Sequence, residues 1–326
     1  MRIFSGIQPT GAKHLGNYIG AIRQYVASQE DGDPYICIVD LHSITVAYDP
    51  ADLRESTLSL AALLLASGLE PDRCTVFVQS HNSDHPAAAW LLSAAASFGE
   101  LRRMTQFKEK ADQQEFVAAG LFTYPVLQAA DILLYQTDVV PVGEDQRQHV
   151  ELTRDVAERF NARFGETFVV PKVATPTVGA KIMDLQEPTK KMSTTGGTAQ
   201  GTLLMLDEPD MIRRKIKSAV TDSGRDVRRG PGKEGIENLI SIMSVSTAEE
   251  PEAIERRYDG AGYGQFKSDV AEAVIDLLGS IQARYRELRG DPGELQRLLA
   301  IGAEKARETS GPTLRKMYER MGFARP

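Results

Sequence analysis

Hydrophobic positions in the first half of the chain follow two alternating patterns. Short runs rich in apolar and β-branched residues predict strands over 2–5, 35–39, 75–79 and 139–142, and the run at 35–39 is typical of a strand buried on both faces. Apolar residues that recur every three or four positions predict helices over 18–28, 51–69, 87–98, 126–135 and 145–164. Strands that alternate with helices predict an α/β fold, with a Rossmann-like parallel sheet covered on both sides.

The pattern changes after about residue 189. Residues 194–201 are rich in Thr and Gly, which is typical of a loop. The remainder has helical spacing almost throughout, over 209–220, 235–245, 265–289 and 294–322. We therefore predict a Rossmann-like first domain over 1–185 and a second, all-helical domain over 186–294. The last helix, over about 295–326, is expected to pack back on the first domain.

The composition mainly excludes certain classes of protein. The 326 residues are 42% hydrophobic and 25% charged, as in an ordinary globular protein. The longest uncharged stretch, 116–130, contains Pro125 and is shorter than the roughly 20 apolar residues of a membrane-spanning helix. The N-terminus has no features of a secretory signal, and Cys37 and Cys74 have no partners at zinc-binding spacing. We expect a cytoplasmic protein without structural disulfides, a zinc site or membrane association.

The charge distribution leaves one question open. A net charge of −7 does not favour general nucleic-acid binding. Basic residues nevertheless gather in one segment: Arg213, Arg214, Lys215, Lys217, Arg225, Arg228, Arg229 and Lys233. The segment is either a solvated helix face and loop or a local contact for a phosphate backbone.

The first candidate site joins the first strand to the first helix, in the stretch Gly6-Ile7-Gln8-Pro9-Thr10-Gly11 and the following His14-Leu15-Gly16-Asn17. Ligands of a doubly wound sheet bind at this kind of junction. His14 and Asn17 are three residues apart and both offer N–H donors to a triphosphate, while Gly16 lets a flat ring approach the backbone. The alternative is a glycine-rich turn with a capping Asn. The spacing fits neither the dinucleotide-binding GxGxxG nor the P-loop.

Two acidic positions mark a second and a third site. Glu144 and Asp145, which follow the strand ending at Val142, could accept hydrogen bonds from ribose hydroxyls or simply cap the next helix. Asp131 falls on the apolar face of its helix, where a carboxylate needs hydrogen-bond donors. It is either a satisfied structural residue or a polar group at the end of an apolar pocket, where a carboxylate suits a donor-only group such as an indole N–H.

The fourth candidate site is the segment Lys190-Lys191-Met192-Ser193-Thr194-Thr195, which leads into the Gly-rich loop. Lysines on a mobile loop can close over a charged substrate and stabilise the transition state of phosphate chemistry. Taken alone, the segment also fits an ordinary solvated loop.

In combination and in this order, these stretches resemble the bacterial tryptophanyl-tRNA synthetases, a family of class I aminoacyl-tRNA synthetases, from Ile3 to about Phe323. The resemblance rests on these stretches: Phe4-Ser5-Gly6-Ile7-Gln8-Pro9-Thr10-Gly11, His14-Leu15-Gly16-Asn17, Asp40-Leu41-His42-Ser43-Ile44-Thr45, Arg103-Met104-Thr105-Gln106-Phe107-Lys108, Ala129-Ala130-Asp131-Ile132-Leu133, Val142-Gly143-Glu144-Asp145-Gln146 and Lys217-Ser218-Ala219-Val220-Thr221-Asp222.

The resemblance implies a function and a role for each matching residue. The chain would activate tryptophan with ATP and Mg²⁺, the metal being carried by ATP, and would load it onto tRNA(Trp) as a homodimer whose helical domain reads the anticodon. The implied ATP-binding residues are Gln8, Pro9, Thr10, Gly16, Asn17, Gly143, Glu144, Asp145, Ile182, Lys191, Met192, Ser193, Thr194 and Thr195. The implied tryptophan-binding residues are Phe4, His42, Tyr124, Asp131, Val142 and Gln146. The implied catalytic residues are His14, Asn17, Lys110, Lys191 and Ser193.

One position departs from the family pattern. The family's loop normally reads Lys-Met-Ser-Lys-Ser, but Thr194 stands in place of the second lysine. Removal of one electrostatic stabiliser of a transition state typically costs about 2.7–4 kcal/mol. Lys190, Lys181 or the threonine hydroxyls could compensate.

Three functions are consistent with the sequence. The first is a working tryptophanyl-tRNA synthetase. The second is the sister tyrosyl-tRNA synthetase, which the tryptophan-type stretches around Asp40 and Asp131 disfavour. The third is a non-enzymatic paralogue that keeps the fold, for which Thr194 alone speaks.

Overall fold

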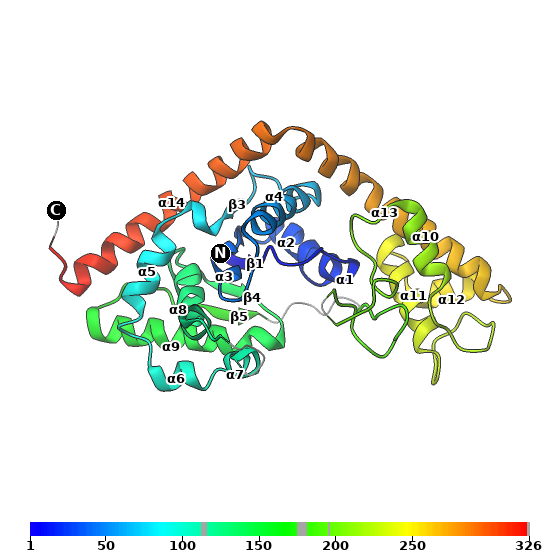
Figure 1. Ribbon diagram of the computed structural model, residues 1–326, viewed down its shortest axis with the longest axis horizontal. Helices are drawn as coiled ribbons and strands as arrows, with labels where there is room; N and C mark the ends of the chain where they lie inside the picture. Colours follow the sequence, from blue (N-terminus) through cyan, green and yellow to red (C-terminus); the bar gives the residue numbers. More distant parts are fainter. Residues whose placement is uncertain (112–115, 175–180, 195, 325–326) are drawn as a thin grey trace. The chain divides into compact units, whose positions relative to one another are not determined.

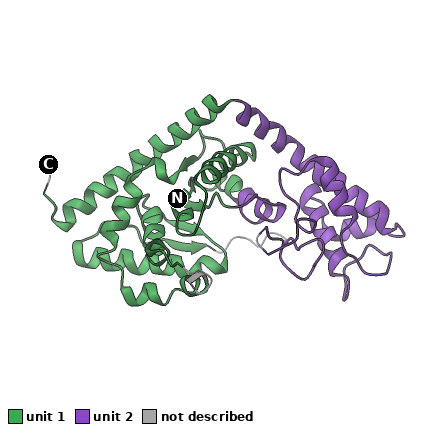
Figure 2. Cartoon of the chain, viewed as in Figure 1, with its two compact units in different colours: residues 1–10, 25–176, 291–326 green, residues 11–24, 177–290 purple. Residues whose placement is uncertain are grey.

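A computed structural model describes residues 1–111, 116–174, 181–194 and 196–324, without the side chains of 110 and 111 (Figure 1). The chain forms two compact units (Figure 2). The first comprises Met1–Thr10, Tyr25–Pro176 and Asp291–Pro326, and the second comprises Gly11–Gln24 and Thr177–Gly290. Within the described residues, no helix is long and apolar enough to cross a membrane.

The first unit is built on a parallel sheet of five strands in the order β3-β2-β1-β4-β5. The strands are β1 (Arg2–Ile7), β2 (Asp33–Ile38), β3 (Thr75–Val78), β4 (Val139–Pro141) and β5 (Lys172–Ala174). The predicted α/β fold with a parallel sheet is therefore confirmed. β5 was not predicted, because its sequence Lys-Val-Ala has no apolar run.

Helices and short helical turns connect these strands. The helices of the first unit are α3 (Asp40–Ser43), α4 (Pro50–Ala66), α5 (Asp84–Leu92), α6 (Phe98–Arg102), α7 (Thr105–Ala111), α8 (Ala119–Leu133), α9 (Arg147–Phe164) and α14 (Pro292–Met321). The 3₁₀ turns are η2 (Ser28–Glu30), η3 (Gln79–His81) and η4 (Glu144–Gln146). The short helix α2 (Arg23–Ala27) runs across the boundary of the two units in the sequence.

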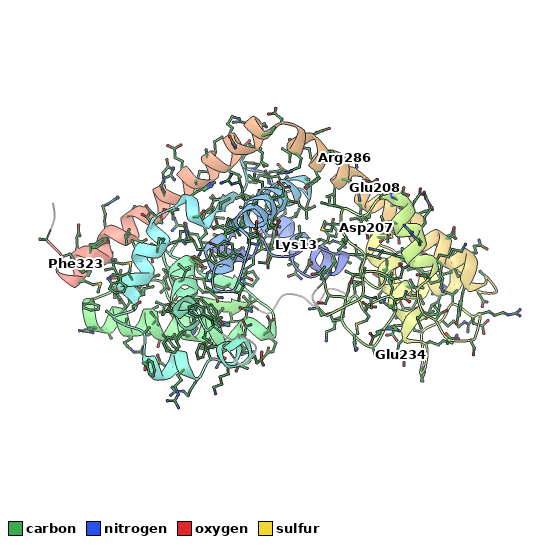
Figure 3. The ribbon with its side chains drawn as sticks, viewed as in Figure 1. Lys13, Asp207, Glu208, Glu234, Arg286 and Phe323 are labelled. Carbon is green, nitrogen blue, oxygen red and sulfur yellow. The ribbon has the colours of Figure 1, made fainter. Side chains whose placement is uncertain are left out.

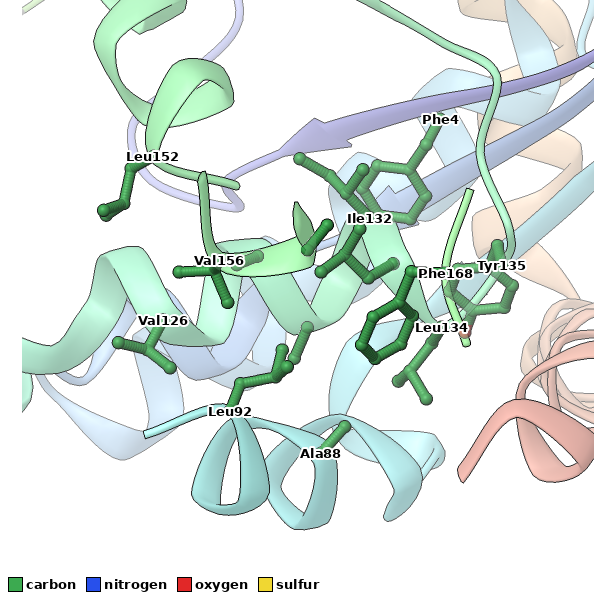
Figure 4. Packing of buried hydrophobic residues seen from close by; sticks show 14 of the residues in the cluster. Phe4, Ala88, Leu92, Val126, Ile132, Leu134, Tyr135, Leu152, Val156 and Phe168 are labelled. Carbon is green, nitrogen blue, oxygen red and sulfur yellow. The ribbon is translucent and has the colours of Figure 1, made fainter. Parts of the chain in front are cut away.

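Aromatic rings form the centre of the core of the first unit. Tyr135 follows α8 and stacks on Tyr35 of β2, with ring centroids 4.8 Å apart, and on Phe4 of β1, at 5.7 Å. Ile132 and Phe168 belong to the same buried cluster (Figure 4). Because each aromatic side chain buries about 150–250 Å², this cluster holds α8 firmly against the sheet.

α8 begins earlier than the sequence pattern predicts. The predicted helix starts at Val126, after Pro125, whereas α8 starts at Ala119 and continues through the proline. An interior proline removes one backbone hydrogen bond and crowds the preceding turn. Burial of Leu121 and Tyr124 on the N-terminal side of the proline offsets this cost.

α14 returns from the end of the chain to the sheet of the first unit. It packs against β3 and α5. Gly302 makes the closest approach, since a Cβ atom at this position would lie 1.8 Å from the carbonyl oxygen of Val76 in β3. Two hydrogen bonds fix the helix further, between Tyr35 Oη and Thr309 Oγ1 at 2.9 Å and from Lys305 Nζ to the carbonyl of Pro71 at 2.6 Å.

The second unit consists of helices joined by loops. Its helices are α1 (Leu15–Asn17), the π-helix η1 (Tyr18–Ile22), α10 (Pro209–Lys217), α11 (Glu234–Thr247), α12 (Pro251–Arg257) and α13 (Tyr263–Gly290). α13 packs against α10 and α11. A buried ion pair stabilises α10, since Nζ of Lys215 in its last turn lies 2.6 Å from Asp207 Oδ2 and 2.7 Å from the carbonyl oxygen of Thr202. Asp207, which precedes α10, is labelled in Figure 3.

Residues 11–24 belong to the second compact unit, although the sequence pattern grouped them with the first strand. The Leu15 N–H donates to the carbonyl of Leu203 at 2.8 Å, and the Met205 N–H donates to the carbonyl of Lys13 at 2.9 Å. These bonds attach the first helical turn to the segment before α10. The functional division into a catalytic part over 1–185 and a helical part over 186–294 stays a prediction.

Candidate active site

A cavity of about 600 Å³ opens in the first unit at the carboxyl ends of β1 and β4. The strand order reverses between these two strands, and ligands of open α/β sheets bind at such a switch point. The cavity is lined by Phe4–Gln8 at the end of β1 and by Val140–Val142 at the end of β4. Its volume is within the range of small-molecule sites.

All six residues predicted to bind tryptophan line this one cavity. They come from β1, α3, α8, the end of β4 and η4: Phe4, His42, Tyr124, Asp131, Val142 and Gln146. The topology therefore gathers residues that are more than a hundred positions apart in the sequence. Their binding of tryptophan stays a prediction at this point.

Asp131 is 1% exposed and accepts three side-chain hydrogen bonds. Its Oδ1 atom lies 2.6 Å from Gln79 Nε2 and 2.6 Å from His85 Nδ1, and its Oδ2 atom lies 2.8 Å from His42 Nε2. Burial alone would raise the pKa of this carboxyl group. The hydrogen bonds from His42 and His85 outweigh burial and hold the pKa at about 2, so the group is an ionised acceptor at neutral pH.

This arrangement leaves Asp131 one free acceptor position. Each carboxylate oxygen offers two lone pairs, and Oδ1 uses both, for Gln79 and His85. Among the described residues Oδ2 accepts only from His42, and Asp131 lines the cavity. The cavity therefore presents a single buried, charged acceptor to a ligand that carries an N–H or O–H donor.

Tyr124 and His42 form an aromatic edge of the cavity. Their rings lie at 80° to each other with centroids 6.2 Å apart. Tyr124 Oη lies 2.7 Å from His149 Nε2, and burial raises the pKa of Tyr124 to about 12, so the phenol stays protonated. Flat apolar walls beside one charged acceptor fit an aromatic ligand with a polar ring atom.

The predicted ATP-binding residues of the first unit lie at the ends of the same strands. Gln8 lines the cavity after β1, and Pro9 and Thr10 follow it in the chain. A Cβ on Gly143 would lie 2.8 Å from Asp145 Oδ1, so glycine lets the carboxylate fold back over the turn. Asp145 Oδ2 accepts from Gln146 Nε2 at 2.9 Å, whereas Glu144 is exposed. Asp145 thus positions Gln146 at the cavity.

In the second unit, His14, Gly16 and Asn17 form the turn that opens α1. Asn17 Oδ1 accepts from the His14 N–H at 3.0 Å, so Asn17 has the capping role that the sequence left as an alternative. His14 Nδ1 is buried and has no hydrogen-bond partner among the described residues. Burial, with Lys13 and Lys191 nearby, lowers the pKa of His14 to about 4, so its imidazole is a neutral hydrogen-bonding group at pH 7. Figure 3 labels Lys13 in this segment.

The loop that carries Thr194 packs beside this turn within the second unit. Residues 182–184 run antiparallel to 190–192, since the Met192 N–H donates to the carbonyl of Ile182 at 3.1 Å. Ile182 and Met192 are buried, whereas Lys191 and Thr194 are exposed. A Cβ on Gly16 would lie 3.9 Å from Met192 Cβ. The ATP-binding candidates of this unit are therefore neighbours.

The groups that could compensate for Thr194 differ in their exposure and in the partners that they already have. Lys190 Nζ forms an ion pair with Glu187 at 2.5 Å, so its charge is partly neutralised. Lys181 is exposed, and Ser193 Oγ accepts from the Gly196 N–H at 3.3 Å. Thr195 and the Lys110 side chain lie outside the described residues.

Sequence reasoning missed several polar residues of the cavity region, three of which bear on Asp131. Gln79 and His85 bind Asp131, and Gln128 lines the cavity one helical turn from both Tyr124 and Asp131. A pattern around Asp131 could show that it needs donors, but not which distant elements supply them. Gln128 could have been found from its i, i+3 spacing to Asp131.

Four of the eight basic residues in segment 213–233 form ion pairs with acidic side chains within the second unit. Arg213 pairs with Glu272 at 2.7 Å, Arg228 with Asp259 at 2.9 Å, and Arg229 with two glutamates. Lys215 is buried in the ion pair with Asp207 described above. The segment thus resembles a solvated, ion-paired surface more than a dedicated phosphate-binding stripe.

Comparison with known proteins identifies close relatives over the whole chain. Residues 1–279 match the family described as "tRNA synthetases class I (W and Y)". The tryptophan--tRNA ligase 2 of Streptomyces avermitilis is 53% identical, over 99% of this chain and 97% of its own. The tryptophan--tRNA ligase of Bacillus subtilis is 50% identical, over 99% of this chain and 98% of its own. The crystal structure of the Campylobacter jejuni tryptophanyl-tRNA synthetase complexed with ADP and tryptophan matches with a TM-score of 0.89 at 34% identity, covering 99% of this chain and all of that chain (100%).

Proposed function

Because the chain belongs to the family of class I tRNA synthetases for tryptophan and tyrosine, we propose that it is a tryptophan--tRNA ligase. It activates tryptophan with ATP and transfers the activated amino acid to tRNA(Trp). The observation that carries this assignment is the buried Asp131 carboxylate, with one acceptor position left for the indole N–H. Curated relatives at about half identity over the full chain act on the same amino acid, as their names state.

The amino-acid site is the cavity of the first unit. Asp131 accepts the indole N–H, while Phe4, His42, Tyr124 and Val142 enclose the ring. Gln146, held by Asp145, positions the amino group. Phenylalanine has no donor for Asp131, and a buried charged acceptor left unpaired is strongly penalised, so it is rejected.

The nucleotide-binding roles follow the same residue-by-residue assignment. In the first unit, Gln8 and the turn at Gly143–Asp145 bind ATP, with Asp145 suited to ribose hydroxyls. In the second unit, Gly16, Asn17, Ile182 and Met192 bind ATP, and His14 meets its phosphates as a neutral donor. In this assignment the Mg²⁺ ion is carried by the phosphates of ATP.

The chemistry requires no protein nucleophile. The tryptophan carboxylate attacks the α-phosphorus of ATP, the bond to the β-phosphate oxygen breaks, and pyrophosphate leaves. A terminal ribose hydroxyl of the tRNA then attacks the acyl-adenylate and releases AMP. The protein contributes by positioning both substrates and by placing positive charge near the leaving pyrophosphate, from Lys191 and Lys110.

We further propose that the chain acts as a homodimer whose helical part, 186–294, reads the anticodon. Two large apolar side chains on the first unit support self-association: Trp90 of α5 is 79% exposed and Phe98 of α6 is 68% exposed. Tryptophan and phenylalanine are enriched at protein interfaces, which supports a role for these two side chains in self-association.

The decisive experiment is attachment of labelled tryptophan to tRNA, with tyrosine at the same concentration in parallel. We expect charging with tryptophan and none with tyrosine. Charging with tyrosine would make the chain the sister enzyme.

A second candidate function is that of a paralogue with weak or no catalysis. It is favoured only by Thr194, together with the ion pair that engages Lys190. Absence of charging with either amino acid would favour it. Thermal stabilisation by tryptophan and ATP together would then show whether the substrate sites are still intact.

A further inference from the structure

A continuous chain of buried hydrogen bonds runs behind Asp131, away from the cavity. His85 of α5 is fully buried, with Nδ1 at 2.6 Å from Asp131 Oδ1 and Nε2 at 2.8 Å from Tyr135 Oη. Asn82 Nδ2 donates to the same Tyr135 oxygen at 3.2 Å and to Ser310 Oγ of α14 at 3.0 Å. None of these four groups belongs to the residues assigned above to substrate binding.

At the far end of this series of hydrogen bonds, the orientation of the Asn82 amide determines which groups donate and which accept. The Asp84 N–H donates to Asn82 Oδ1 at 3.1 Å, so the Asn82 amide nitrogen is the group that faces Tyr135 and Ser310. Ser310 in turn donates to the Asp84 carboxylate at 2.5 Å. Both hydrogens of the Asn82 amide are therefore used as donors, which leaves Tyr135 Oη as an acceptor on that side.

The Tyr135 hydroxyl in turn determines which ring nitrogen of His85 carries the proton. Burial raises the pKa of Tyr135 well above its usual range, so its hydroxyl keeps its proton and donates to His85 Nε2. With Nε2 accepting, the ring proton lies on Nδ1, which donates to Asp131. Every bond from Asn82 to Asp131 thus points the same way, and the sequence of donors ends on the carboxylate.

We propose that His85 is a positioning residue for tryptophan recognition. Tyr135 orients His85 so that its Nδ1–H donates to Asp131 Oδ1. The free lone pair of Oδ2 is then left for the indole N–H. The proposal rests on the proposed tryptophan specificity. Without His85, Asp131 would keep only Gln79 on Oδ1 and His42 on Oδ2 and could rotate or take up a proton more easily. A protonated Asp131 has fewer lone pairs with which to accept from the indole. Gln79 shares Oδ1, but its amide has no comparable connection to α14 among the described residues.

Two substitutions separate this role from simple core packing. In His85→Asn, the new Nδ2 atom is bonded to Cγ as the histidine Nδ1 is, so the donor to Asp131 is retained. In His85→Gln, the new polar atoms lie near the former Nε2 position, so the contact with Tyr135 is retained and the donor to Asp131 is lost. Both variants remove the aromatic ring, and asparagine, one methylene smaller, leaves the larger void, so packing alone would make His85→Asn the more damaging of the two.

The measurement is ATP–pyrophosphate exchange, with KM determined separately for tryptophan and for ATP. We expect His85→Gln to raise KM for tryptophan about tenfold or more, the effect of losing a hydrogen bond to a charged group, with KM for ATP unchanged. His85→Asn should remain within about threefold of the parent for both substrates. Equal KM values for tryptophan in the two variants, or a parallel rise for both substrates, would overturn the proposal.

A pH profile gives a readout that packing would not produce. The titratable groups near Asp131 are His42 of α3, His85 of α5, Cys37 of β2, Tyr124 of its own helix, Tyr135 just after that helix, and Glu109 of α7 at the cavity wall. In the parent, Asp131 stays ionised far below neutral pH, so it adds no pH dependence to KM for tryptophan between about pH 5 and 8. In His85→Gln, burial is less well compensated, and KM for tryptophan should rise as the pH falls. A flat profile in the variant would count against the role.

Tyr135→Phe keeps the ring stack and tests the chain if the histidine variants do not fold. Loss of the hydroxyl removes the group that orients His85, so KM for tryptophan should rise severalfold, with KM for ATP unchanged. An unchanged KM for tryptophan would overturn the part assigned to Tyr135. If the parent enzyme uses tyrosine and not tryptophan, the proposed function itself fails, and the role of His85 toward an indole fails with it.

Discussion

At the scale of single residues, Asp131 has two duties that mutation should separate. The carboxylate is the acceptor for the indole and also the common partner of three buried donors, His42, Gln79 and His85. Asp131→Ala should raise KM for tryptophan at least about tenfold while KM for ATP changes little, since a charged hydrogen bond to the ligand is lost. The free energy of unfolding should fall by about 1–3 kcal/mol or more, because the donors lose their acceptor.

Steady-state exchange kinetics and urea unfolding measure the two effects independently. Tryptophan selectivity that is unchanged in Asp131→Ala would reject Asp131 as the indole acceptor. That Asp131 requires buried hydrogen-bond donors was predictable from the sequence, because a carboxylate on an apolar helix face must be satisfied. Its donors were not predictable, because Gln79 and His85 approach it only through the packing of η3 and α5 against α8.

Thr194 is the residue where this chain departs from its family, and restoring the charge tests its consequence. Thr194→Lys should raise the single-turnover rate of tryptophan activation about tenfold or more, because each transition-state donor of this kind is worth about 2.7–4 kcal/mol. Thr194→Gln is the matched control, long and polar but uncharged, and should leave the rate near that of the parent.

Equal rates for Thr194→Lys and the parent would show that another cation already supplies the charge. Lys13 and Lys191 are the first candidates, since both act on His14 electrostatically, whereas Lys190 is engaged with Glu187. Lys13→Gln in the parent, where no lysine at position 194 masks the loss, would then decide between them.

At the scale of elements, the periodicity of apolar residues predicted the strands and helices that have a regular local pattern. It missed the features that depend on tertiary packing. The four predicted strands and the long helices follow from their apolar spacing. The stretch over 18–28 is helical, as predicted, but begins with the π-helix Tyr18–Ile22, which no pattern of apolar residues distinguishes from an α-helix. β5 exists because its three residues extend the edge of the sheet beside β4, and this pairing is not visible in its own sequence.

The contact between α14 and β3 gives a prediction for an element. Gly302→Ala places a methyl group 1.8 Å from the carbonyl oxygen of Val76, so α14 must move away from the strand. We expect the free energy of unfolding to fall by about 1–3 kcal/mol, as for other overpacked sites. Urea unfolding followed by circular dichroism measures the change.

Gly279→Ala is the matched control in the other long helix, α13. A Cβ there meets nothing within 4 Å, so alanine should stabilise the helix by up to about 1 kcal/mol through its higher propensity. A loss of stability at both positions alike would contradict the close approach of α14 to β3.

At the scale of the whole molecule, the sequence predicted two domains but not which segments of the chain belong to each compact unit. Residues 11–24 follow the first strand directly, yet their backbone bonds to Leu203 and Met205 place them in the second compact unit. A pairing across nearly two hundred residues has no local signature. The family resemblance predicts the candidate site residues one by one. The proximity of residues 14–17 to Met192 within the second unit, by contrast, accompanies this long-range pairing and has no local signature.

Self-association is the property of the whole molecule that the surface predicts. Trp90→Lys places a charge where α5 exposes its largest apolar side chain, and should weaken a homodimer about 30-fold or more, the effect of losing a central aromatic contact. Sedimentation velocity over a range of concentrations measures the shift from dimer to monomer. Val169→Lys is the control, an exposed apolar residue between α9 and β5, and should leave the dimer intact. A parent protein that sediments as a monomer at every concentration would exclude the homodimer, and a Trp90→Lys dimer as tight as the parent's would place its interface elsewhere on the molecule.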